Sequence, residues 1–256
     1  MPIRLDHIAV AVHRLSDATS TIVGLLGGAP AEGGPGRGFR GAQWRFDGGG
    51  RLEVLEPVGP PDGFLYRFLA AHGPRVHHAT FIVPELRAAA DRARALGFDV
   101  VGYEDSKPWW KEAFLHPKKA LGIVVQLAES HTDIPGDSWT KDFPFPAASP
   151  AAVPPVRLVG VRLSARSLEA AERQFGTLLG GTCRETAGGV AYHWDDSPLR
   201  IAVSVDATRP EGPLCLEVER QPPPRLPDAI DPRFGVRVVA VTGSRSGSPD
   251  RTAGSC

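Results

Sequence analysis

The sequence predicts an α+β protein built from tandem βαβββ units. A strand-like stretch containing a histidine occurs twice, as LDHIAVAV at residues 5–12 and VHHATFIV at residues 76–83. Each stretch is followed by a helix-like segment, and the pattern begins a third time near residue 156. Repeated patterns of this kind indicate one structural unit used several times. Because a unit of about 60 to 70 residues has only a marginal core alone, we expect the first two units to pair edge to edge.

The first two units align at an offset of 71 residues, which places His7 on His78. One helix is expected over HRLSDATSTIVGLLGG, with Ser16 as its N-cap. The other is expected over PELRAAADRARALGFD, which begins with proline and ends at a glycine. Further strands follow in each unit, and the last ones, EVLE at residues 53–56 and QLAE at 126–129, match at an offset of 73.

The third copy follows PFPAASPAAVPP, a composition typical of an interdomain linker. VRLVGVRLSARSLEAAERQFGTLLGG aligns with IRLDHIAVAVHRLSDATSTIVGLLGG at an offset of 153, and FGVRVVAVTG is a strand-like remnant of a fourth copy. We therefore expect two units with a functional site over residues 1–131, a Pro-rich linker over 132–155, a degenerate βαβββ-type domain over 156–243, and a disordered tail over 244–256.

Composition and charge exclude several classes of partner. The chain is 42% hydrophobic and 23% charged with a formal net charge of zero, so it offers no electrostatic attraction to nucleic acid or to a membrane surface. No apolar run approaches the roughly 20 residues that span a bilayer, and the N-terminus lacks the apolar core of a signal peptide. The three cysteines lie far apart, which favours a reducing compartment and argues against disulfides or a thiolate metal site. We expect a cytoplasmic protein.

Four polar residues occupy matched positions in the two units: His7 with His78, and Glu53 with Gln126. Because residues i and i+2 share one face of a strand, two units related by a pseudo-two-fold axis bring all four to one concave face. Two imidazoles, a carboxylate and an amide oxygen suit a divalent ion such as Fe, Co, Ni, Mn or Zn. His77 is the alternative to His78, but alternation sends the two to opposite faces and the overlay on His7 selects His78.

The third copy cannot form the same site. In the alignment Gly160 and Ala202 take the places of the first histidine and of the glutamate. The C-terminal domain therefore either covers the first domain as a dimer partner would, leaving a pseudo-dimer or a homodimer as alternatives, or forms a separate binding surface. Glu56 and Glu129 are expected to face away from the cavity and to be solvated.

The stretches LDHIAVAV, HHATFIV, RLEVLEP and HPKKALGIVVQLAE together resemble the vicinal oxygen chelate superfamily, most of all its methylmalonyl-CoA epimerase branch, over about residues 3–130. The resemblance implies a curved, partly open mixed sheet around a cavity, with the four matched residues as metal ligands. The last ligand is usually glutamate in the epimerases, where this chain has Gln126. These epimerases also carry a glutamate about 16 or 17 residues before the second ligand, and that glutamate acts as the catalytic base. This chain has Gly36 and Arg37 there, its nearest acid is Glu32, and arginine cannot act as a base.

A divalent ion that chelates two substrate oxygens acidifies the neighbouring C–H and stabilises the resulting oxyanion. Glu53 would then be ligand and base together, as the resemblance to the glyoxalase branch implies. The expected activity is that of an epimerase, isomerase or glyoxalase-type lyase on a small carbonyl or acyl-CoA substrate. Two alternatives stay open: a non-catalytic small-molecule binding protein of the resistance type, and an extradiol-type dioxygenase that uses His7, His78 and Glu53.

The substrate itself is expected to be held by aromatic and cationic residues at the mouth of the cavity. The alternative is that these are ordinary loop and strand residues. The candidates are Trp44, Trp109, Trp110, Lys118 and Arg37.

Overall fold

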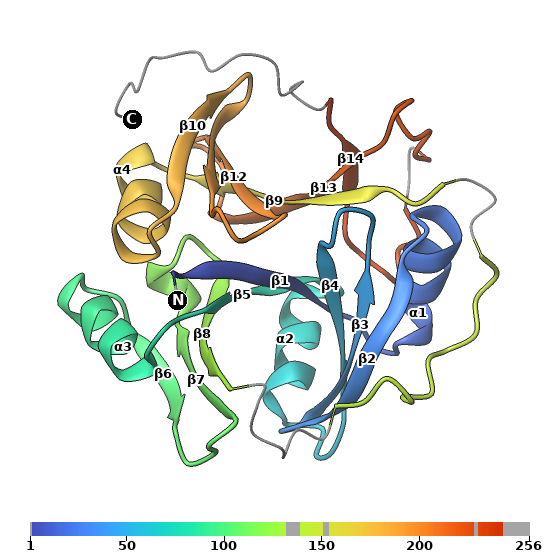
Figure 1. Ribbon diagram of the computed structural model, residues 1–256, viewed down its shortest axis with the longest axis horizontal. Helices are drawn as coiled ribbons and strands as arrows, with labels where there is room; N and C mark the ends of the chain where they lie inside the picture. The colour runs from blue at the N-terminus through green and yellow to red at the C-terminus, as the bar shows by residue number, and fades with distance from the viewer. Residues whose placement is uncertain (1, 132–138, 151–153, 228–229, 243–256) are drawn as a thin grey trace.

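The computed structural model describes residues 2–131, 139–150, 154–227 and 230–242, which form two curved β-sheets (Figure 1). The elements around the first sheet are β1 (Arg4–Ala11), α1 (Ser16–Thr19), η1 (Ser20–Leu25), β2 (Ala29–Gly36), β3 (Phe39–Arg45), β4 (Arg51–Pro57), α2 (Phe64–His72), β5 (Arg75–Ile82), α3 (Leu86–Ala95), β6 (Val100–Glu104), β7 (Trp110–Leu115), η2 (Pro117–Lys119) and β8 (Val124–Ser130). Those around the second are β9 (Arg157–Ala165), α4 (Leu168–Ala171), η3 (Glu172–Leu178), β10 (Thr182–Thr186), β11 (Gly189–His193), β12 (Arg200–Val205), β13 (Gly212–Glu219) and β14 (Val238–Ala240).

The first sheet has eight strands in the order β2-β3-β4-β1-β5-β8-β7-β6. Its two halves meet where β1 pairs antiparallel with β5, and each half continues outward through a parallel pair, β1 with β4 and β5 with β8. The predicted mixed α+β fold in tandem βαβββ units is thus confirmed, including their edge-to-edge pairing. Helix α2 was not predicted; it lies within the curve of the sheet, whereas α1 and α3 lie outside it (Figure 1).

The second sheet repeats most of this order. Its six strands run β10-β11-β12-β9-β13-β14, which corresponds strand for strand to β2-β3-β4-β1-β5-β8. Within the described residues nothing corresponds to β7 and β6. The remnant predicted from FGVRVVAVTG is the short strand β14, which pairs parallel with β13 as β8 does with β5.

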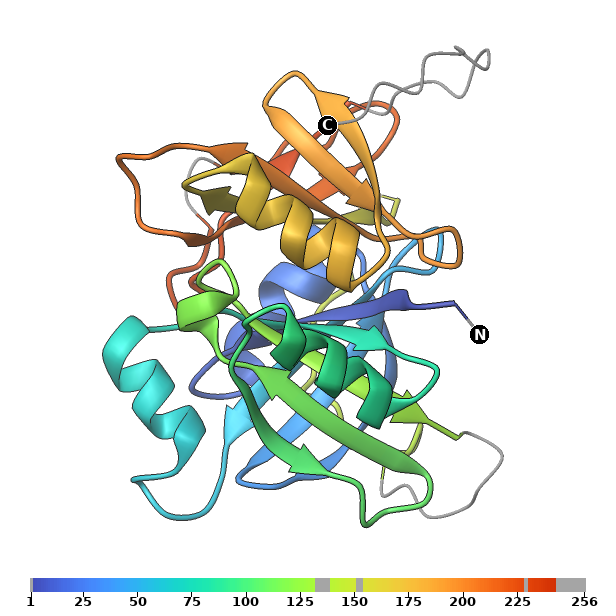
Figure 2. The ribbon, with the colours of Figure 1, turned by 90° about the vertical axis from the view of Figure 1, so that its left-hand side faces the viewer.

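One hydrophobic core joins the two sheets. Buried side chains from the outer face of the first sheet, such as Val10, Phe81 and Val125, belong to the same cluster as Val161 and Ile201 of the second sheet. Helix α4 and its continuation η3 lie between the second sheet and α3 (Figure 2). The inner face of the first sheet, which carries His7, therefore points away from the C-terminal sheet.

Two glutamates of the inner strands stabilise helix starts and are not solvated as expected. Oε2 of Glu56 accepts the backbone N–H of Leu15 at 2.7 Å, and Oε2 of Glu129 accepts that of Leu86 at 2.8 Å. Both carboxylates do face away from the cavity, but Glu129 is buried and Glu56 is partly buried. Each is drawn to a helix start because the first N–H groups of a helix have no partner within it and attract negative charge. The predicted N-cap Ser16 is instead the first residue of α1, and the N-cap is Leu15, whose side chain makes no cap bond.

Two other expectations concern the chain's ends and its cysteines. The predicted tail lies outside the described residues. Of the cysteines, Cys215 is a buried thiol. Among the described helices, none is long and apolar enough to cross a membrane.

Replacing Glu129 by glutamine should lower stability at pH 7 by about 1 kcal/mol, the usual effect of losing a helix cap. Burial alone would raise the pKa of Glu129, but the N–H of Leu86, Lys111 and His131 lower it from 4.5 to about 2. The stabilisation is therefore present above the unfolded pKa and is lost as pH falls through the folded value. Urea unfolding at neutral and acidic pH measures this difference.

The control is Glu185→Gln, a change at an exposed position of β10 that should leave stability unaltered. Equal stability of Glu129→Gln and the unsubstituted protein at neutral pH would contradict the capping role. A difference that does not shrink with acid would contradict the charge-based explanation.

Candidate metal site

The two predicted histidine ligands each follow a β-bulge, and the two bulges occupy equivalent places in the two units. In the pairing of β1 with β5, Asp6 is the extra residue on β1 and His77 is the extra residue on β5. A bulge interrupts the alternation of side chains along a strand. Asp6 and His77 can therefore turn toward the residues that follow them, His7 and His78.

These bulges overturn the expectation that His77 faces away from His78. The Nδ1 atoms of the two rings are 2.8 Å apart, and His77 packs edge to face on Phe68 of α2 with ring centroids 4.6 Å apart. In the other unit, Nδ1 of His7 lies 2.9 Å from Oδ2 of Asp6. Both candidate ligand histidines thus engage their bulge neighbour through Nδ1 and keep Nε2 for the cavity.

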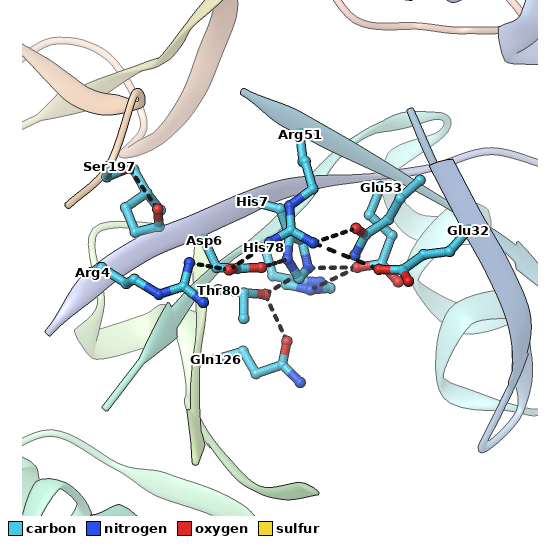
Figure 3. A network of polar contacts seen from close by, with 12 residues as sticks. Arg4, Asp6, His7, Glu32, Arg51, Glu53, His78, Thr80, Gln126 and Ser197 are labelled. Carbon is cyan, nitrogen blue, oxygen red and sulfur yellow. Dashed lines mark hydrogen bonds and ion pairs between the residues drawn. The ribbon is translucent and has the colours of Figure 1, made fainter. Parts of the chain in front are cut away.

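The two Nε2 atoms converge on one carboxylate (Figure 3). Oε2 of Glu53 lies 2.7 Å from Nε2 of His7 and 3.7 Å from Nε2 of His78. One ligand atom from each of the three residues lies within 4.8 Å of the others, and the residues are only 3% to 6% exposed. Nε2 of His78 is buried without a hydrogen-bond partner, which costs about 1 to 3 kcal/mol. The donor set and this nitrogen fit a divalent transition metal ion.

The charge state of the site differs between the two histidines. Burial alone would lower the pKa of His7, but Glu53 and Asp6 together raise it to about 9. Burial lowers the pKa of His77 to about 4, and burial together with the two neighbouring rings lowers that of His78 well below its usual value. At neutral pH His7 is therefore protonated, whereas His77 and His78 are neutral and share one N–H between their Nδ1 atoms.

Gln126 is linked to the histidines through Thr80. The Thr80 hydroxyl donates to Oε1 of Gln126 at 2.7 Å and lies 3.0 Å from Nε2 of His7. The amide N–H of Gln126 donates to Oε2 of Glu112 at 2.7 Å, and the indole N–H of Trp110 donates to the same oxygen at 2.9 Å. Because Glu112 accepts the amide N–H, the amide oxygen is turned toward the histidines. In known metal sites, residues that hydrogen-bond to a ligand fix its orientation in the same way.

Asp6 is held in place by two arginines (Figure 3). Arg4 pairs with it, and Nη2 of Arg51 lies 3.0 Å from its Oδ1. Burial would raise the pKa of Asp6, but His7 and the arginines hold it well below its usual range. The buried carboxylate thus remains charged and compensated, since an unpaired buried charge would be strongly destabilising.

Position 36, where the epimerases would carry their glutamate, is next to Phe39. A Cβ added to Gly36 would lie 2.2 Å from the Phe39 ring, so a side chain at this position would require the ring to move. Glu32 pairs with Gln43, and Gln43 pairs with Glu53, so all three lie on one face of the sheet. The carboxylate of Glu32, however, contacts Arg51 at 3.6 Å and neither histidine. Among the described acids, Glu53 is the one that touches both histidines.

Of the predicted substrate residues, Trp44 is placed wrongly. It is fully buried on the opposite face of β3 and packs on Phe145 with ring centroids 5.2 Å apart. The register pairs Gln43 with Glu53, so by alternation Gln43 and Arg45, and not Trp44, share the cavity face.

The other predicted substrate residues are more exposed to solvent than Trp44. Trp110 is partly buried and reaches the cavity through Glu112. Trp109 precedes β7 and is partly buried, Lys118 lies exposed in η2, and Arg37 lies exposed in the turn between β2 and β3. Their contact with a substrate remains a prediction.

Comparison with known proteins places the first half of the chain among related sequences. A family model described as the glyoxalase/bleomycin resistance protein/dioxygenase superfamily matches residues 6–114. The ethylmalonyl-CoA/methylmalonyl-CoA epimerase of Cereibacter sphaeroides is 32% identical over 135 residues, covering 49% of this chain and 97% of that protein. The mitochondrial methylmalonyl-CoA epimerase of Homo sapiens is 31% identical over 137 residues, covering 50% of this chain and 74% of that protein.

The chain belongs to the glyoxalase/bleomycin resistance protein/dioxygenase superfamily. The predicted resemblance to its methylmalonyl-CoA epimerase branch is thereby confirmed. A solved structure of a mutant 4-hydroxymandelate synthase from Streptomyces coelicolor covers 86% of this chain and 71% of its own, with a TM-score of 0.59 and 15% identity. At that identity the likeness concerns the fold alone, and it extends over both sheets.

The C-terminal sheet keeps the backbone features of the first sheet without the candidate ligands. Its central pair, β9 with β13, has bulges at the equivalent places, yet Gly160 stands where His7 does and Cys215 where His78 does. Instead, the carboxylate of Glu217 pairs with Arg162 at 2.6 Å and with Arg200 at 2.8 Å. The bulges are therefore common to both sheets, whereas the candidate metal ligands lie in the first sheet alone.

Sequence reasoning missed Asp6, Thr80 and Glu112. A signal for Asp6 was present, because the offset that overlays His7 on His78 also overlays Asp6 on His77. The sequence contained no such signal for Thr80 or Glu112, because each acts through a partner on a neighbouring strand.

Replacing His77 by phenylalanine should weaken binding of a divalent metal ion about 10- to 100-fold, the usual effect of removing the group that orients a ligand histidine. The ring volume is kept, but the acceptor for the Nδ1–H of His78 is lost. Competition with a coloured chelator measures the affinity. His13→Phe, at an exposed position, should bind like the unsubstituted protein, and equal affinity of both variants would contradict the role of His77.

Metal binding should tighten with rising pH, by about tenfold per unit between neutral pH and the pKa of His7. Since that pKa is raised to about 9, an ion must displace one proton from His7 at neutral pH. Calorimetry in two buffers of different ionisation enthalpy counts the released protons. A metal affinity that does not change with pH would contradict the protonated state of His7.

Proposed function

We propose that this protein is a metal-dependent enzyme that moves a proton at the carbon beside a carbonyl group of a small substrate, as an epimerase or isomerase does. The observation that carries the proposal is the convergence of Nε2 of His7, Nε2 of His78 and Oε2 of Glu53 in a buried site. Gln126 is the fourth ligand in this proposal. A divalent ion there, of Co, Ni, Mn, Fe or Zn, would supply a Lewis acid that holds two substrate oxygens and stabilises the negative charge left by the departing proton.

Glu53 is the proposed base. Its Oε2 faces the two histidines, whereas its Oε1 lies 2.9 Å from the position that a Cβ on Gly41 would occupy. The second oxygen is thus directed away from the histidines, over a residue without a side chain. In the proposed step Oε1 accepts the proton from the substrate carbon, and returning it to the other face of that carbon gives epimerisation. Returning it to a neighbouring atom gives isomerisation or the glyoxalase type of lyase reaction.

The proposed substrate class is a small carbonyl compound or an acyl-CoA thioester. Two relatives named as epimerases of coenzyme A thioesters support this class. Arg37 and Lys118, which are exposed cations, are the proposed contacts for a phosphate or carboxylate of the substrate.

A second candidate function is extradiol-type oxygenation. It is favoured by the ligand set of two histidines and one carboxylate, which also suits non-haem iron. A protein that binds a small molecule at the same site without catalysis is the remaining alternative. Oxygen consumption separates the oxygenase from the binding protein, because only an oxygenase consumes oxygen when it is given Fe²⁺ and a catechol.

Incubation in heavy water with a panel of 2-oxo acids, 2-hydroxy ketones and acyl-CoA thioesters should show exchange of the proton next to the carbonyl group. The exchange should stop with EDTA and fall by about 10²-fold or more in Glu53→Gln, since a positioned base contributes that much. Proton NMR of the substrate measures the rate.

The matched control is Glu32→Gln, an acid on the same face that touches Arg51 and neither histidine. Its exchange rate should stay near that of the unsubstituted protein. Exchange that survives in Glu53→Gln but not in Glu32→Gln would move the base to Glu32. Bound metal without exchange on any substrate would contradict the proposed reaction and favour the oxygenase or the binding protein.

A further inference from the structure

The segment that links the two sheets straddles the edge of the first one. Thr140 exchanges two backbone hydrogen bonds with Gly33 of the edge strand β2, at 3.0 Å and 2.9 Å. On the outer face, a Cβ added to Gly33 would lie 2.6 Å from Phe143, and Phe145 packs on Trp44. We call residues 139–145 the strap. It covers an edge strand that would otherwise present unpaired N–H and C=O groups.

On the inner face the strap places an indole beside the proposed base. A Cβ added to Gly41 would lie 2.5 Å from Cη2 of Trp139 and 2.9 Å from Oε1 of Glu53. The indole edge and the carboxylate oxygen therefore lie over the same glycine. Gly41 pairs with Leu55 and so shares the face of Glu53. A residue from outside the two βαβββ units thus forms one wall of the space next to Glu53.

The position of this wall restricts what can lie between it and Glu53. The other carboxylate oxygen, Oε2, is taken by His7 at 2.7 Å, so Oε1 is the oxygen left for a substrate, and the indole of Trp139 stands beside it. The carbon that loses its proton then carries its remaining substituent against the indole. An aromatic wall favours a short alkyl group or a flat one, and a longer chain would have to displace it.

We propose that Trp139 is the residue that sets substrate size, and that the site takes metal-chelating substrates whose reacting carbon bears nothing larger than a short alkyl group. This inference rests on the proposed function, because it uses Glu53 as base and the metal site as anchor. Trp139 lies beyond residues 6–114, which match the superfamily model, so the size limit is a property of this chain's own linker.

The test is binding of substituted malonates to the full chain loaded with Co²⁺, measured by calorimetry. Malonate chelates through two oxygens, and the carbon between them carries a single variable substituent. We expect methylmalonate to bind at least about tenfold more tightly than butylmalonate, within the range that a few methylene groups produce in a fitted pocket. In Trp139→Ala the two should bind nearly equally, Trp139→Phe should lie between, and unsubstituted malonate should bind all variants alike.

The control variant is Phe145→Leu, which alters the strap on the outer face of the sheet and should keep the size preference. Thermal unfolding of each variant checks that the fold is intact. Equal binding of the two malonates to the unsubstituted protein, or an unchanged preference in Trp139→Ala, would overturn the role of Trp139 alone. Absence of Co²⁺ binding in every variant would overturn the proposed function and this inference together. A size preference without proton exchange would leave Trp139 as proposed and reject only the reaction.

Discussion

The antiparallel pairing of β1 with β5 is the interaction on which the candidate site depends. It joins the two units, and its two bulges release Asp6 and His77 from the alternation of side chains. Each released residue meets Nδ1 of the following histidine, so both Nε2 atoms point inward. A regular ladder would have sent Asp6 and His77 to the outer face and left Nδ1 of both ligands without a partner.

The same junction concentrates charge in a buried place, and the surrounding residues compensate it. Glu53 and Asp6 are both buried acids, and each has a cationic partner, His7 for the first and Arg51 with Arg4 for the second. Buried charges are tolerated only when they are paired and hydrogen-bonded. The network therefore leaves neither buried carboxylate of the candidate site without a charged partner.

The two sheets show how one backbone supports different chemistry. Both keep the strand order and the bulges, but only the first carries two histidines and a glutamate, while the second has an arginine–glutamate cluster. The C-terminal sheet does not share the inner cavity. It packs on the outer face and touches the β1 bulge through Ser197, which donates to the carbonyl of Leu5 at 2.6 Å.

The sequence by itself determined the repeat, the α+β class and the matched residues His7, Glu53, His78 and Gln126, because duplication leaves a constant offset that can be measured without coordinates. It did not determine which neighbours orient them. Strict alternation assigned His77 to the wrong face, because the bulge appears only in the strand pairing. Trp44 was assigned to the cavity wrongly, because the face that each residue of β3 takes is fixed only by its pairing with β4. Only the tertiary structure brought Thr80, Glu112 and Trp139 to the site, because each reaches it from another strand or from the linker, and distance along the chain carries no information about such contacts.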